Sequence, residues 1–148
     1  MAEINRKELI LALVGAGTSP RLAGVDLTAL DMTRLDLSGA SLRAAKLQAA
    51  SLREAILRAA NLSYADLTVA QMVGADFANA NLTGANFTGA VMQSARLQNA
   101  NLTSANLSNA NLLNVNLRGA VVDNLVFNEE TTWPDGKQGS QGNPADYI

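Results

Sequence analysis

The chain has 148 residues, no cysteine, no histidine and a formal net charge of −2. Without Cys or His it can form neither disulfides nor thiolate metal sites, and it lacks the common nucleophile and base pairs of hydrolases. The small net charge disfavours bare nucleic acid as a partner, and no apolar run approaches the roughly eighteen residues of a membrane span. We expect one domain with no cofactor, no metal, and neither a membrane nor a nucleic-acid partner.

Residues 1–20 are expected to form a capping helix and a linker. Asn5 followed by Glu8 has the spacing of a capping box, although Ser or Thr is the usual cap. Gly15 or Gly17 would end the helix. Its apolar side would consist of Leu9, Ile10, Leu13 and Val14.

The same segment has some features of a signal peptide. Arg6 and Lys7 precede an apolar stretch, but Glu3 and Glu8 flank that stretch and it is short. We therefore expect a cytoplasmic protein, with export as the alternative. In this interpretation the helix covers the open end of the repeat that follows, because a bare solenoid end exposes unpaired backbone.

A five-residue pattern runs from Val25 to Glu129 without an insertion or a deletion. A large apolar residue occupies every fifth position from Leu27 to Phe127, which makes 21 units, and the residue two places earlier is alanine at all fifteen positions from 40 to 110. A period of five matches neither a helix nor a long strand, so the chain must turn a corner once per unit. Four units would close a square coil, with the large residue and the alanine inside.

This pattern, as in Ala80-Asn81-Leu82-Thr83-Gly84, resembles the pentapeptide-repeat family. The resemblance implies an all-β solenoid, a right-handed quadrilateral parallel β-helix, here of about five coils over residues 21–129. Its coils would stack at the strand spacing of roughly 4.8 Å. Most members of the family have no assigned biochemistry, and fold does not imply function.

The last position of each unit suggests a change of turn type near Gly74. Before it the position carries residues such as Tyr64 and Val69, whereas Gly and Asn predominate after it. Since Gly and Asn tolerate the positive φ of a type II turn and Val and Tyr do not, we expect mostly type II turns only from Gly74 onward.

Asparagine columns are the second expected feature of the outer surface. Residues twenty apart should stack, which places Asn61, Asn81 and Asn101 in one column and Asn86 with Asn106 in another. We expect a structural ladder with side-chain amide bonds between coils.

Residues 130–148 are expected to form a C-terminal cap and a flexible tail. Trp133 is the only tryptophan and is interpreted as a plug over the last coil. From Lys137 to Asp146 the composition is rich in Gly, Ser, Gln, Asn and Pro, which favours mobility.

The charged residues do not converge in the predicted coil. Asp66 and Asp76 would lie on opposite faces, so they cannot act as a general acid and base pair. The basic cluster of the linear sequence would form a belt with one charge on each of four sides: Arg43, Lys46, Arg53 and Arg58. These features predict a protein that is not an enzyme.

Inhibition of DNA gyrase, or of another DNA-processing enzyme, by DNA mimicry is the alternative function that the family resemblance implies. Such mimicry needs acidic columns along the rod. Between residues 25 and 127 there are seven acidic and seven basic residues, so the rod is neutral.

The function that we expect first is a non-enzymatic structural and interaction scaffold, which presents flat β faces to an unidentified protein partner. One face of the predicted coil favours this function. It is centred on Met32, Leu52, Met72, Met92 and Leu112. Its outward side chains are the candidate contact residues Arg53, Gln71, Val73, Val91, Gln93 and Leu113, and gathered apolar side chains are typical of a contact site. With both ends capped, we expect a monomer or a weak dimer.

Overall fold

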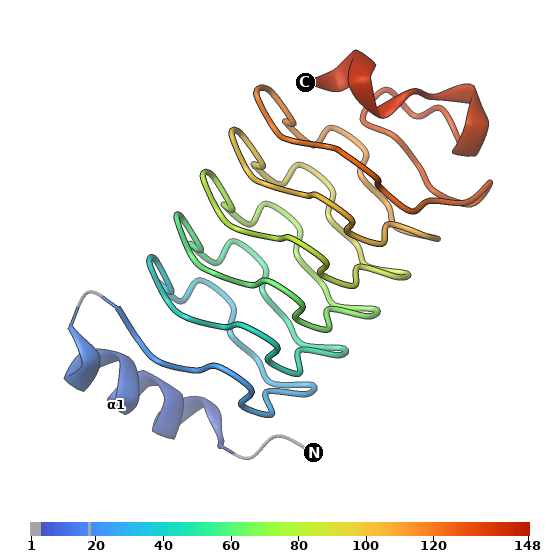
Figure 1. Cartoon of the computed structure of the whole chain (residues 1–148). Helices are drawn as coiled ribbons and strands as arrows, with labels where there is room; N and C mark the ends of the chain where they lie inside the picture. The colour runs from blue at the N-terminus through green and yellow to red at the C-terminus, as the bar shows by residue number, and fades with distance from the viewer. Residues whose placement is uncertain (1–3, 18) are drawn as a thin grey trace.

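The computed structural model describes residues 4–17 and 19–148, which form a rod of stacked coils between a helix and a C-terminal cap (Figure 1). Helix α1 spans Arg6–Ala16, and two short 3₁₀ helices follow the coils, η1 at Gly139–Gln141 and η2 at Pro144–Tyr147. Among the described residues the β structure consists of single bridges rather than longer strands.

Parallel bridges join residues that are twenty apart and define four faces. Face A has the rungs Arg21, Ser41, Asn61, Asn81, Asn101 and Val121; face B has Asp26, Lys46, Asp66, Asn86, Asn106 and Val126; face C has Asp31, Ser51, Gln71, Val91, Asn111 and Thr132; face D has Asp36, Ile56, Asp76, Arg96 and Asn116. The four-sided coil of about five turns is therefore confirmed. The ladder starts at Arg21, one unit before the unbroken five-residue pattern that begins at Val25.

The interior is a narrow column of large and small side chains. All fifteen alanines from Ala40 to Ala110 have a relative exposure of 0–1%, and so does the large apolar residue of each unit between Leu27 and Leu112. Because every corner places one alanine beside one large side chain, the square interior is filled and only the remaining three residues of a unit face outward.

The predicted change of turn type is wrong. The last residue of every unit from Gly24 to Asn124 has a positive φ, including Tyr64 at 59° and Val69 at 52°. Coil stacking explains this uniformity, since the N–H groups of Tyr64 and Val69 donate to the Thr83 and Thr88 carbonyls, each at 2.9 Å. Those bonds hold the corner in one geometry, whatever side chain it carries.

Replacing Val69 by Asn should therefore stabilise the protein by about 1 kcal/mol, because a left-handed φ costs a branched residue roughly this much and Asn less. Thermal unfolding should show a melting temperature higher by about 2–4 °C. Val73→Asn is the matched control, since Val73 is not among the residues with a positive φ. An equal gain in both variants would contradict the strain argument.

The asparagine columns form as predicted, and amide bonds between coils do occur, as from Asn86 to the Thr68 hydroxyl at 3.1 Å, but the Oδ1 atoms of the columns bond within their own turns. Asn61 and Asn81 each use Oδ1 to accept the N–H two residues later, at 3.0 Å from Ser63 and 3.1 Å from Thr83. Asp36 does the same with the Ser38 N–H at 2.9 Å. The Asn or Asp before the buried residue is thus an Asx-turn residue, which explains its recurrence in the repeat.

Helix α1 covers the first coil, as predicted. Asn5 and Glu8 form the reciprocal capping box, and Gly17 ends the helix with a φ of 66°. Leu9 is fully buried. The Arg6 guanidinium donates to the carbonyls of Asp31 at 2.6 Å and Thr33 at 2.9 Å. In later coils the equivalent carbonyls accept N–H groups from the coil below, so Arg6 replaces part of a missing coil.

The C-terminal cap is built around Trp133, which is fully buried as predicted. Its ring lies edge-on to Phe127 at 5.1 Å and stacks on Tyr147 at 5.8 Å. Its Nε1–H donates to the Gly139 carbonyl at 2.8 Å. One extra residue enters the last coil, since Asn111 pairs with Thr132.

The segment that was expected to be mobile packs back on this cap. Thr132 pairs antiparallel with Gln138, and η2 carries Tyr147 onto Trp133. Hydrogen bonding to Lys137 lowers the pKa of Asp135 to about 2. The Tyr147 hydroxyl also donates to Asp135 at 2.9 Å. This hydrogen bond joins the C-terminal end of the tail to its beginning.

Candidate functional site

The structure brings the six predicted contact residues together on face C. The bridges from Ser51 through Gln71 and Val91 to Asn111 align their units. Arg53 is exposed, whereas the other five, Gln71, Val73, Val91, Gln93 and Leu113, are half-buried. The apolar members, Val73, Val91 and Leu113, thus each expose part of their side chain on a flat face of the rod.

The edges of this strip differ in polarity. Arg53 reaches one coil upward, and its NH2 donates to Gln71 Oε1 at 3.5 Å. Leu113 lies near the C-terminal cap, because a Cβ on Gly136 would come within 3.8 Å of Leu113 Cδ1. Gln93 stands between Val73 and Leu113 in one column, and Gln71 and Asn111 flank Val91 in the next, so apolar and hydrogen-bonding side chains alternate along the strip.

Tyr64 and Val69 are apolar residues that were not selected as contact candidates from the sequence. Their side chains are exposed, at 59% and 48% relative exposure. They occupy neighbouring corners on either side of face B. The Arg43 guanidinium lies 5.9 Å from the Tyr64 ring centroid, a cation–π contact. A bulky residue at a corner where most units carry a small or polar one was the sequence signal.

Face B itself is occupied by a polar network. Gln48 donates to Asp66 Oδ2 at 2.7 Å, and Asn86 donates to the Thr68 hydroxyl at 3.1 Å. Thr68 in turn donates to Asp66 Oδ1 at 2.5 Å. Because these side chains satisfy one another, face B is better described as a stabilising wall than as a binding surface.

The charged residues lie as the folded sequence predicted. Arg43, Lys46, Arg53 and Arg58 belong to faces A, B, C and D in turn, and Asp66 and Asp76 lie on opposite faces. Within the described ranges no three Asp or Glu side chains are grouped closely enough to hold a metal ion. None of the helices that the structure describes is long and apolar enough to cross a bilayer.

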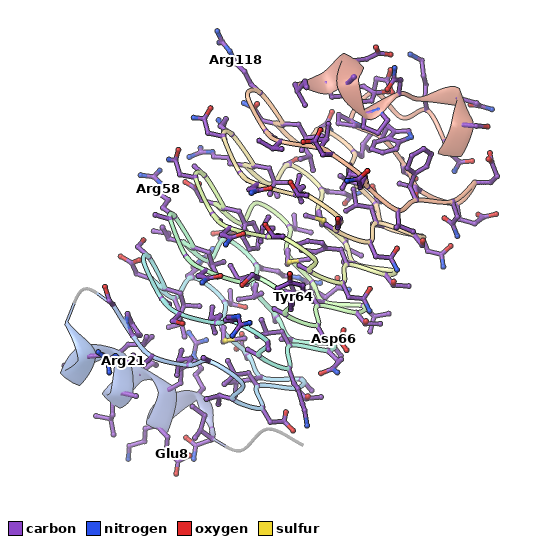
Figure 2. All side chains as sticks on the ribbon, viewed as in Figure 1. Glu8, Arg21, Arg58, Tyr64, Asp66 and Arg118 are labelled. Atoms are coloured by element: carbon purple, nitrogen blue, oxygen red, sulfur yellow. The ribbon has the colours of Figure 1, made fainter. Side chains whose placement is uncertain are left out.

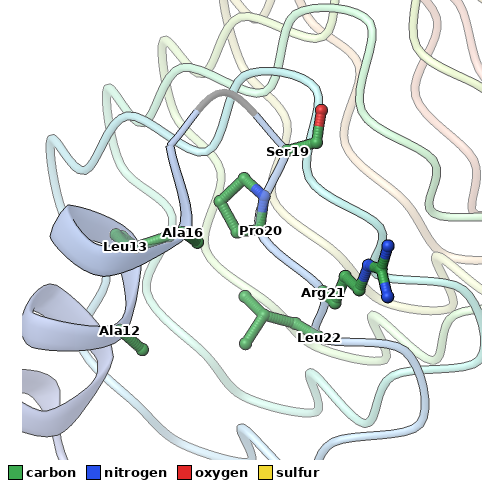
Figure 3. A pocket seen from close by; sticks show the side chains of 7 residues that line it. All are labelled: Ala12, Leu13, Ala16, Ser19, Pro20, Arg21 and Leu22. Carbon is green, nitrogen blue, oxygen red and sulfur yellow. The ribbon is translucent and has the colours of Figure 1, made fainter.

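A cavity of about 330 Å³ lies between α1 and the first coil (Figure 3). Its lining is mostly apolar, from Ala12, Leu13, Ala16, Pro20 and Leu22, with Ser19 and Arg21 at its border. Figure 3 shows the Arg21 guanidinium directed away from the hollow. Since neither the Ser19 hydroxyl nor the Arg21 guanidinium is aimed inward in Figure 3, we interpret this cavity as a packing gap under the helix.

Comparison with known proteins identifies the repeat. Residues 21–58, 36–68, 70–109 and 95–128 match the family model described as Pentapeptide repeats (8 copies). This chain belongs to the pentapeptide-repeat family. A search of curated proteins finds no match.

Solved pentapeptide-repeat structures support the same fold. Rfr23 from the cyanobacterium Cyanothece 51142 is 26% identical with a TM-score of 0.78, over 86% of this chain and 99% of that one. A trypsin-treated QnrB1, a plasmid-mediated fluoroquinolone resistance protein, is 18% identical with a TM-score of 0.51, over 74% of this chain and 70% of that one.

A third pentapeptide-repeat protein is HetL from the cyanobacterium Nostoc sp. strain PCC 7120, which is involved in heterocyst differentiation regulation. It is 32% identical with a TM-score of 0.35, over 80% of this chain and 61% of that one. The family match and Rfr23 confirm the right-handed quadrilateral β-helix. Pentapeptide-repeat proteins are generally non-enzymatic scaffolds.

Proposed function

We propose that this pentapeptide-repeat protein is a non-enzymatic scaffold that binds a protein partner through face C. The observation that carries the proposal is the partly exposed apolar strip of Val73, Val91 and Leu113 on one flat wall. Partly exposed apolar side chains interspersed with Gln and Arg side chains can supply both the apolar contact and the hydrogen bonds of a protein interface. α1 and the cap cover the two ends of the rod, so we propose a monomer or a weak dimer.

The absence of enzymatic activity belongs to the same proposal. Asp26, Asp31 and Asp36 lie on three successive faces, each facing its own wall of the rod. A general acid and a general base must approach the same substrate atom. Side chains fill the interior, so the buried volume of the rod offers a substrate no room.

Replacing Val73 and Leu113 together by Lys should abolish capture of the partner and leave folding intact, because both changes place charge on the apolar strip. The measurement is a pull-down from native lysate with the full chain as bait, with captured proteins identified by mass. Val121→Lys with Val126→Lys is the matched control, since these valines are more exposed, at 42% and 51%, and lie on faces A and B. Capture that survives the face C change would rule out the strip.

Salt separates this function from DNA mimicry. An apolar contact hardly weakens as salt rises, whereas a DNA mimic loses affinity steeply. Between residues 21 and 127 no face carries more than two acidic residues: face A has Asp123, face B has Asp26 and Asp66, face C has Asp31 and Glu54, and face D has Asp36 and Asp76. A topoisomerase captured only at low salt would nevertheless favour mimicry over the scaffold.

A further inference from the structure

Face D contains a hollow of about 320 Å³ that no role described above uses. It arises where Ala78 stands between two long side chains in the same outward column, Arg58 one coil below and Gln98 one coil above. The short Ala78 side chain leaves the floor open, and its long neighbours form the sides. Asn79, Asp76 and Arg96 complete the lining.

Asp76 holds two arginines at the edge of this hollow. Its side chain is only 9% exposed, and its Oδ2 lies 2.7 Å from Arg58 Nε and 3.6 Å from Arg96 NH1. Its Oδ1 accepts the Ala78 N–H at 3.1 Å. Burial alone would raise the pKa of the Asp76 carboxyl, but the Ala78 N–H, the Arg58 guanidinium and the charge of Arg96 together hold this pKa below its usual value.

The charges of Arg58, Arg96 and Asp76 sum to one positive charge. The side chains of Arg58 and Arg96 are 58% and 61% exposed, so their remaining N–H groups face solvent. Both oxygens of Asp76 already accept hydrogen bonds, which leaves the hollow with donors for a ligand. Arg118, one coil above Gln98 in the same column, projects from the same side of the rod as Arg58 (Figure 2).

We propose that this hollow on face D binds a carboxylate side chain from an acidic segment of a protein partner. The guanidinium groups of Arg58 and Arg96 are held one coil below and one coil above Asp76, and planar guanidinium forks suit carboxylate oxygens. This surface is separate from face C and stands independently of the function proposed for that face.

Two neighbouring groups favour a peptide over a phosphate. The Gln98 side chain lines the hollow, and within the described residues its buried amide oxygen receives no hydrogen bond. A peptide brings N–H groups, and the Gln98 amide oxygen can accept their hydrogen bonds once the side chain turns outward. A phosphodiester offers only acceptors. Ile56, 37% exposed and bridged to Asp76, adds an apolar contact beside the arginines.

The test is an array of short random peptides probed with the labelled full chain. Peptides that contain Asp or Glu should be enriched among those that bind. Arg96→Gln should weaken the best peptide about tenfold, the loss of a charge-assisted hydrogen bond, and it leaves the Arg58–Asp76 pair in place. Ala78→Leu should weaken it similarly by filling the hollow without changing any charge.

Arg21→Gln is the matched control, because it removes the same charge from face A and should bind like the wild type. The Val73→Lys, Leu113→Lys variant should also bind the peptide normally, which separates this site from face C. Absence of Asp and Glu enrichment, or full affinity in both face D variants, would overturn the proposal. If a double-stranded oligonucleotide or inorganic phosphate competes better than the peptide, the proposal of a protein ligand is wrong and the site binds phosphate.

Discussion

Trp133→Ala is expected to destabilise the C-terminal cap by about 3–5 kcal/mol, the usual cost of truncating a buried tryptophan. The ring is fully buried, and the change removes its contacts with Phe127 and Tyr147 as well as its hydrogen bond to Gly139. Gly142 lies against the ring and has no side chain with which to fill the resulting void.

The loss should be local rather than global. Each coil of a solenoid contacts only its neighbours, so the cap can open while the middle coils remain folded. Hydrogen exchange should therefore accelerate at the amides that bond to the cap, such as Leu112, which donates to the Thr132 carbonyl at 2.8 Å. Amides near Leu62 should be unchanged.

Tyr147→Ala is the matched control, because it removes only the outer stacking partner of Trp133 and keeps the plug. We expect a smaller loss, restricted to η2. If Trp133→Ala leaves exchange at Leu112 unaltered, the tryptophan is not what closes the last coil.

The overall fold could be predicted from the sequence because the five-residue repeat determines it. A period of five with Leu and Ala at fixed places determines which residues point inward, and residues twenty apart must then stack. The same arithmetic placed Val73, Val91 and Leu113 on one face. It could not predict their exposure, since half-burial depends on how far the neighbouring side chains of adjacent coils extend.

The corners and the outer polar residues were harder to predict because two local rules compete there. Residue preference argued that Val69 would avoid a positive φ, but hydrogen bonds between coils impose that φ on every corner. Stacked asparagines suggested bonds between coils, but Asn61 is captured by the N–H two residues later in its own turn. In each case the backbone geometry of the repeat prevails over the side-chain preference.

The remaining features depend on single residues that no periodic pattern marks. Arg6 lies in the helix, yet its side chain completes hydrogen bonds of the first coil. The hollow on face D exists because Ala78 lies between Arg58 and Gln98, which are each twenty residues away. The spacing of twenty stacks these three residues in one column, but only the side-chain conformations show that a hollow forms between them.

Ala80→Leu should destabilise the rod by about 1–3 kcal/mol or more, since an overpacked core must displace side chains or backbone. Ala80 is 1% exposed, and its backbone is bonded on both sides, with its N–H donating to Phe77 and its carbonyl accepting from Asn101. The corner therefore cannot move outward without breaking bonds to the coil above. Three extra carbon atoms would have to enter a column that alanine already fills.

The measurement is the melting temperature together with the denaturant midpoint, compared with Ala78→Leu. Ala78 is half-buried and faces outward, so the same substitution two residues earlier should change stability by no more than about 0.5 kcal/mol. A large difference between the two leucine variants would show that the narrow interior, and not a general preference for alanine, selects the small residue. An Ala80→Leu variant as stable as the wild type would mean that the inner column has spare volume.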